Sequence, residues 1–131
     1  MIVHFPVGLL ISGVVFEIYG ALRNDEVAET AGRYNIRFGL WFLFPVLLVG
    51  FLGMISLENT EEFKDFLSSH LTFALCTAGL FFSAMLVSRY LRQPLGRALY
   101  FIIIGVGGIC LLTTGYFGGE LVHRFGVSTH Q

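Results

Sequence analysis

Four long apolar runs alternate with short polar stretches along the chain. The runs cover residues 3–22, 38–55, 66–87 and 100–122, and the stretches between them hold nearly all of the charged side chains. A helix needs about 20 residues to cross the roughly 30 Å hydrocarbon core of a bilayer. The pattern therefore predicts four transmembrane helices, and the short connections favour an up-down order.

Composition supports the same class of protein. The 131 residues are 55% hydrophobic and 13% charged, and the mean hydropathy is +0.75, which is far from the balance of a soluble domain. We expect one all-α integral membrane domain covering residues 1–131, folded as an up-down bundle of four helices. The sequence contains no nucleic-acid-binding motif and no phosphate-binding glycine loop, so we expect no nucleic-acid partner. The expected surroundings, from the composition, are the lipid bilayer.

The polar stretches differ in their content of basic residues. The first and third together hold six arginines: Arg23, Arg33, Arg37, Arg89, Arg92 and Arg97. The second holds Lys64, and Arg124 follows the last apolar run. Because cytoplasmic connections carry an excess of Lys and Arg, we expect both termini to face outward. We also expect a short interfacial helix within residues 23–37.

Interfacial aromatic rings are expected on the inner side of the membrane. They are Tyr34, Trp41, Tyr90 and Tyr100, which lie near the predicted inner ends of the apolar runs. Trp and Tyr are enriched at this level in membrane proteins. These residues therefore need no functional explanation.

Three histidines from three predicted helices lie near the outer membrane level. His4 begins the first run, His70 lies about one turn inside the third, and His123 closes the fourth. Residues four apart share a helical face, and on that face small residues follow each histidine. They are Gly8 and Ser12 after His4, Ala74, Thr77 and Ala78 after His70, and Gly119, Gly115, Gly108 and Gly105 before His123. Small residues permit close helix packing or leave a flat slot between helices.

A haem fits such a slot, because its iron has two axial positions that neutral histidine can fill. The first and third helices of an up-down bundle run in the same direction and lie diagonally, so His4 and His70 can face each other. We therefore predict that they ligate one b-type haem. The residues predicted to leave room for the ring are Gly8, Ala74, Gly115 and Gly119. The alternative is structural: interfacial histidines hydrogen-bond water or headgroups, and glycines serve packing.

Glu120, three residues before His123, permits three interpretations. It can bind a metal ion with histidines of the other helices, or it can accept a hydrogen bond that orients a ligating imidazole. It can also be an interfacial carboxylate paired with Arg124. His123 and Glu120 are further candidates for contact with a haem propionate or a partner.

Glu17 is the other ionisable residue within an apolar run, and such residues require partners. It lies near the predicted inner end, where we expect it to reach water or an arginine such as Arg97. The middle of the bilayer offers hydroxyl groups that commonly bond to their own helix. This pattern favours neither a transporter nor a transmembrane electron wire.

The segments "HFPVGLL" and "LLTTGYFGGELVHRFGV", together with His70, resemble an uncharacterised family of small bacterial four-helix membrane proteins, the domain of unknown function 2231. The resemblance implies a four-helix fold in the bacterial inner membrane, and the arginine pattern then predicts that both termini are periplasmic. His4 and His70 match the family pattern. His123 occupies a position where the family has tyrosine, and the family's own histidine aligns with Phe125. The family has no assigned activity, so the resemblance implies no reaction.

The preferred functional hypothesis is a small membrane redox subunit that binds one b-type haem near the periplasmic face. It would exchange electrons with a partner cytochrome or a quinone, and we expect no catalytic activity of its own. A second hypothesis is a non-catalytic accessory or assembly subunit of a larger membrane complex. A third is a non-haem metal site formed by His4, His70, Glu120 and His123.

Overall fold

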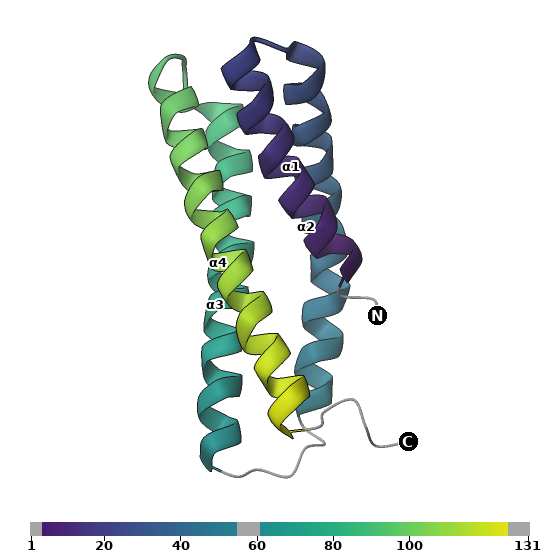
Figure 1. Cartoon of the computed structure of the whole chain (residues 1–131). Helices are drawn as coiled ribbons and strands as arrows, with labels where there is room; N and C mark the ends of the chain where they lie inside the picture. Colours follow the sequence, from purple (N-terminus) through teal and green to yellow (C-terminus); the bar gives the residue numbers. More distant parts are fainter. Residues whose placement is uncertain (1–3, 55–60, 126–131) are drawn as a thin grey trace.

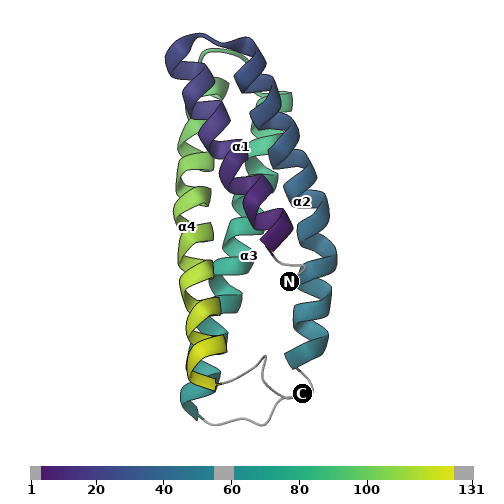
Figure 2. The same cartoon turned by 45° about the vertical axis from the view of Figure 1, so that its right-hand side comes forward.

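Four long helices form the computed structural model, which describes residues 4–54 and 61–125. They are α1 (His4–Arg23), α2 (Glu26–Met54), α3 (Glu61–Tyr90) and α4 (Leu95–Phe125). Each helix runs antiparallel to the one before it, so that two hairpins, α1–α2 and α3–α4, stand side by side (Figures 1 and 2). All four are long and apolar enough to cross a membrane. The predicted all-α, up-down transmembrane bundle is confirmed.

The helices extend beyond the apolar runs, most clearly at the start of α2. Asn24 adopts a left-handed conformation with φ of 54°, which ends α1 and reverses the chain. One Asp25 carboxylate oxygen, Oδ1, then accepts hydrogen bonds from the backbone N–H groups of Val27 (3.0 Å) and Ala28 (3.1 Å). This is N-terminal capping, so α2 begins at once. The separate interfacial helix expected within residues 23–37 is wrong, because residues 26–37 are the first turns of α2.

Glycines allow α1 and α2 to pack backbone against backbone. A Cβ atom added to Gly13 would lie 3.1 Å from the carbonyl oxygen of Gly32, and one added to Gly32 would lie 2.8 Å from that of Gly13. One heptad along each helix, Gly20 faces the backbone of Glu29 and Gly39 faces Leu10. Such contacts leave no room for side chains and hold transmembrane helices together by close packing.

We call the end of the bundle where short turns join α1 to α2 and α3 to α4 the connection end, and the opposite end the far end. Helix α1 stops well before the far end (Figure 1). The ring of Phe5 packs against that of Phe42 at a centroid distance of 4.9 Å. Since α2 continues from there to Met54, its last 18 Å, roughly, extend past the start of α1.

The apolar core lies across both hairpins in the half of the bundle nearer the connection end. Its buried residues are Leu10, Ile36, Leu40, Leu43, Phe81, Ala84, Tyr100, Ile104 and Leu111. Between 22% and 28% of each candidate span is buried inside the protein. Large apolar side chains such as Trp41, Leu48 and Ile109 are more than 60% exposed. In a membrane protein lipid covers these surfaces.

Candidate functional site

His70 lies on the side of α3 that packs against α4. Its Nδ1 atom is 3.0 Å from the backbone carbonyl oxygen of Thr114. A carbonyl oxygen can only accept a hydrogen bond, so Nδ1 carries the proton and donates it. In the neutral ring the other nitrogen, Nε2, then has a free lone pair. This arrangement is typical of a histidine that ligates a metal through Nε2.

The His70 ring is also fixed by its neighbours. A Cβ atom added to Gly118 would lie 3.1 Å from Cε1 of the imidazole and 3.4 Å from Nδ1. Ala74 and Thr77, one and two turns farther along α3, are buried. The hydroxyl of Thr77 donates to the carbonyl of Phe73 on its own helix. The absence of a side chain at Gly118 therefore allows the imidazole to reach α4.

His4 is the first helical residue of α1, and it is exposed. It shares one face of the helix with Gly8, Ile11, Val15 and Ile18, all of which are exposed. This spacing of four and three residues defines a single stripe, and the stripe faces away from the core. The structure thus places His4 on the outer surface of the bundle.

The level of His4 along the bundle nevertheless agrees with that of His70. Gly108 of α4 lies beside Val14 of α1. Ten residues farther toward the far end, α4 reaches Gly118, the neighbour of His70, and α1 reaches His4. The two helices are antiparallel and rise by the same amount per residue. The level of His4 thus agrees with the predicted pairing with His70, whereas the outward direction of its side chain does not. The His4–His70 pair stays a prediction.

His123 and Glu120 lie at the far end of α4. His123 is exposed, whereas Glu120 is paired with Arg124, which also lies 3.7 Å from Glu62 at the start of α3. The interpretation of Glu120 as a carboxylate paired with Arg124 is confirmed. His123 follows Gly118, the neighbour of the His70 ring, by five residues, so it lies roughly 8 Å nearer the far end than His70.

No group of three or more His, Cys, Asp or Glu side chains in residues 4–54 and 61–125 is arranged to hold a metal ion. This geometry gives the predicted non-haem site no support. For the same reason, the geometry does not support Glu120 as a ligand in a metal site of three or more such side chains.

The predicted glycine slot is open in part. Added Cβ atoms at Gly115 and Gly119 would meet nothing within 4 Å. Both share the α4 face of Gly108, which still touches Val14 of α1. Gly105, nearer the connection end, is open as well, so Gly108 is the member of this glycine column that approaches α1. Gly8 is also open, but on the exposed stripe of α1.

A second candidate site, near the connection end, is a cluster of charged and polar side chains. Glu17 of α1 is 1% exposed, and Tyr100 of α4 is 7% exposed. The Tyr100 hydroxyl donates to Glu17 Oε1 at 2.8 Å. Nε of Arg33, on α2, lies 3.7 Å from the same oxygen. Three helices thus meet at one buried carboxylate.

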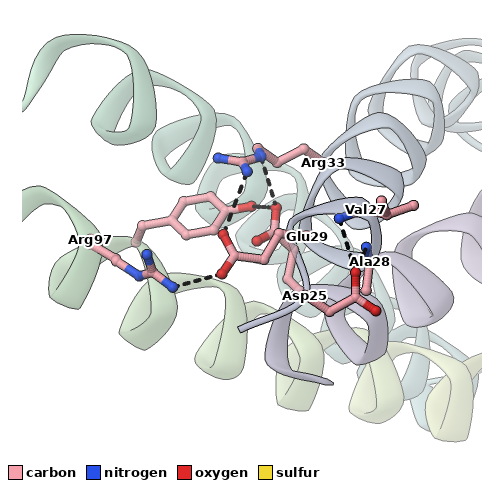
Figure 3. Close-up of polar contacts among 8 residues, drawn as sticks. Asp25, Val27, Ala28, Glu29, Arg33 and Arg97 are labelled. Carbon is pink, nitrogen blue, oxygen red and sulfur yellow. Dashed lines mark hydrogen bonds and ion pairs between the residues drawn. The ribbon is translucent and has the colours of Figure 1, made fainter. Parts of the chain in front are cut away.

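Glu29 extends this cluster toward the surface. It lies between two guanidinium groups (Figure 3): that of Arg97 on α4, at 2.6 Å, and that of Arg33, at 3.5 Å. An adjoining pocket of about 60 Å³ is also lined by Ser88 and Gln93. A water molecule occupies about 30 Å³ of liquid volume, so the pocket has room for water. We call Glu17, Glu29, Arg33, Arg97 and Tyr100 the polar cluster.

Sequence reasoning found part of the polar cluster. It identified Glu17 as a carboxylate that needs a partner, but the partners are Tyr100 and Arg33 rather than Arg97. The placement of Tyr100 in the aromatic belt is wrong, because its ring is buried and its hydroxyl is bonded inside the bundle. Tyr34, Trp41 and Tyr90 are exposed, as that prediction requires.

The family model "Predicted membrane protein (DUF2231)" matches residues 1–131. The chain belongs to this family. Its membership in DUF2231 confirms the resemblance found in the terminal motifs and agrees with the four membrane-spanning helices. No curated protein and no solved structure matches the chain.

Proposed function

We propose that this DUF2231 protein is a small membrane redox subunit that binds one b-type haem with His70 as an axial ligand. The observation that supports the proposal is the hydrogen bond from His70 Nδ1 to the Thr114 carbonyl. It fixes the tautomer that leaves Nε2 unprotonated, and neutral imidazole nitrogen is an axial ligand of haem iron.

The surroundings of His70 fit this role at one axial position. The Thr114 carbonyl orients the ring, as hydrogen-bond acceptors behind metal-ligating histidines do. Gly118 leaves space for the ring, and the positions of Gly115 and Gly119 are open.

The second axial position is assigned to His4 by the sequence pattern. In the structure His4 lies at the level of Gly118 but on the outward stripe of α1. Ligation by both residues therefore requires the His4 ring to turn toward α4, whereas ligation by His70 uses the ring as it stands. The proposal depends on His70 as one axial ligand. Whether the haem iron has a second protein ligand is tested separately, with a His4 variant.

The depth of His70 indicates the side on which electrons would be exchanged. It lies nine residues into α3, which begins at Glu61 and ends at Tyr90. These distances correspond to roughly 14 Å from the far end and 30 Å from the connection end. The partner, a cytochrome or a quinone, would therefore act at the far end. The arginine-rich connections at the opposite end support placing the far end on the periplasmic side of a bacterial inner membrane, because cytoplasmic connections carry an excess of Lys and Arg.

The test is an absorption spectrum of the protein expressed in haem-replete cells and purified in detergent. We expect a Soret band that shifts on reduction, and its loss in His70→Ala. The matched control is His123→Ala, because His123 is exposed on the same hairpin. A colourless wild-type protein, or a His70→Ala variant with its full haem content, would contradict the proposal. The colourless result with unchanged thermal stability would favour an accessory subunit instead.

His4→Ala then reports on coordination. If His4 is the second ligand, the variant should change from a six-coordinate low-spin spectrum to a five-coordinate high-spin one. If its spectrum equals that of the wild type, His4 is not a ligand, and His70 alone holds the iron from the protein side.

A further inference from the structure

The polar cluster joins the two hairpins at one end of the bundle. Within the described residues, the side-chain hydrogen bonds and ion pairs between the hairpins lie there: Tyr100 to Glu17, and Arg97 to Glu29. Glu17 and Glu29 belong to the α1–α2 hairpin, and Tyr100 and Arg97 to α4. The connection end is therefore held by directional contacts in addition to apolar packing.

The far end has a different character. Beyond Leu43, none of residues 44–52 of α2 is buried, although α2 continues there as a regular helix. On the facing hairpin, Gly115 and Gly119 have no atom within 4 Å of an added Cβ. The α1–α2 and α3–α4 hairpins thus share a core near the connection end, whereas α2 stands apart from α3 and α4 toward the far end, as Figure 2 shows.

Each hairpin is tightly packed within itself. In α1–α2 the backbones touch at Gly13 and Gly32. In α3–α4 the rings of Phe73 and Phe117 stack at 5.7 Å, and Arg124 pairs with Glu62 at the far end. Contacts within a hairpin therefore persist along its length where contacts between hairpins do not.

We infer that the two hairpins move as rigid bodies about the polar cluster, which acts as a hinge, and that their separation varies at the far end. Rigid-body movement about a few fixed contacts is a common form of conformational change. The distance from Glu29 to Leu52 is 23 residues, or roughly 35 Å of helix. A rotation of about 10° would move the far end of α2 by about 6 Å. This inference does not depend on haem binding.

The test uses pulsed electron paramagnetic resonance between pairs of spin labels on the full chain in lipid nanodiscs. Cys76 and Cys110, which are both free, are first replaced by alanine. One label pair, at Val27 and Leu95, spans the hairpins at the connection end. A second pair, at Leu52 and Val122, spans them at the far end. All four sites are exposed, so labels should not disturb the packing.

We expect the far-end distance distribution to be at least twice as wide as the connection-end distribution. A pair within one hairpin, at the exposed residues Leu75 and Leu112, controls for the mobility of the label itself and should give a narrow distribution. Equal widths at the two ends would overturn the inference, because the hairpins would then form one rigid body.

The role of the cluster is tested with the double variant Glu29→Gln/Tyr100→Phe. It removes the Glu29 charge that pairs with Arg97, together with the hydroxyl that Tyr100 donates to Glu17. We expect the connection-end distribution to widen to the width seen at the far end. The matched control is Lys64→Gln, which breaks an exposed pair with Glu61 within α3 and should change neither width. An unchanged connection end in the double variant would show that the cluster is not the hinge.

Discussion

Close packing of α1 against α2 makes a quantitative prediction for Gly32→Ala. The added methyl group would lie 2.7 Å from the backbone nitrogen of Glu17 and 2.8 Å from the carbonyl oxygen of Gly13. An ordinary contact needs 3.4 Å or more, so the two helices must move apart by several tenths of an ångström. Overpacking of this kind costs about 1–3 kcal/mol.

The matched control is Gly50→Ala on the same helix. A methyl group at Gly50 would meet nothing within 4 Å, and both substitutions gain the same helix propensity, about 1 kcal/mol. The propensity gain therefore cancels in the comparison. We expect Gly32→Ala to be less stable than Gly50→Ala by about 1–3 kcal/mol.

The assay is reversible unfolding by sodium dodecyl sulfate in mixed micelles, followed by far-ultraviolet circular dichroism. Gly13→Ala provides a second measurement at the same contact, since its methyl group would lie 2.7 Å from the side chain of Ile36. If Gly32→Ala and Gly50→Ala agreed within about 0.5 kcal/mol, the scatter of surface substitutions, the backbones would not be in contact at this point.

Three further predictions concern the two candidate sites and the far end. Tyr100→Phe removes a buried hydrogen bond to Glu17 and should destabilise the protein by about 1–3 kcal/mol in the same unfolding assay. Gly118→Ala should displace the His70 ring, which lies 3.1 Å from the new methyl group; in haem-loaded protein this should shift the Soret band or lower the haem content. Arg124→Gln breaks a pair with the exposed Glu62 and one with Glu120, whose side chain is 24% exposed. Because the Arg124 side chain is itself half-exposed, the loss should be less than about 1 kcal/mol.

The first two of these predictions have control variants. Tyr90→Phe, on a tyrosine that is 71% exposed, should leave stability unchanged, whereas an equal loss in both tyrosine variants would refute the buried hydrogen bond. Gly79→Ala, at an exposed position of α3, adds a methyl group to open space away from the predicted haem slot and should leave the Soret band in place. A loss well above 1 kcal/mol for Arg124→Gln would show that its pairs are shielded from solvent.

Hydropathy predicted the number and order of the helices because burial in lipid requires long uninterrupted apolar helices. It did not predict their bounds, because capping and helix propensity continue a helix past the membrane surface. Residues 26–37 illustrate this. They lie before the apolar run, yet they form the first turns of α2, because the Asp25 cap starts the helix at Glu26. Propensity and capping are local signals that a hydropathy window averages away.

The burial of Tyr100 could not be predicted from its position near a membrane interface. A tyrosine at that level can face lipid headgroups or the bundle interior with equal hydropathy. The choice is set by which α4 face meets α1, and Glu17 on α1 supplies the acceptor for the hydroxyl. Glu17 and Tyr100 are 83 residues apart in the chain, and a contact between two such distant residues cannot be predicted from a single sequence.

The direction of His4, by contrast, had a signal in the sequence. Successive helical residues are rotated by about 100°, so the 13 residues between His4 and Glu17 correspond to about 220° after complete turns. The two side chains therefore point to largely opposite sides of α1. A carboxylate within a membrane span must face the protein interior, and the buried residues Pro6, Leu10, Gly13, Glu17 and Gly20 form that inward stripe. Glu17 thus determines which face of α1 is inward, and a regular helix then directs His4 outward.

His70 has no such conflict, because Gly118 and the Thr114 carbonyl hold its ring between α3 and α4. The evidence for a ligand site therefore rests on α3 and α4, and the contribution of α1 depends on whether its first turn can rearrange.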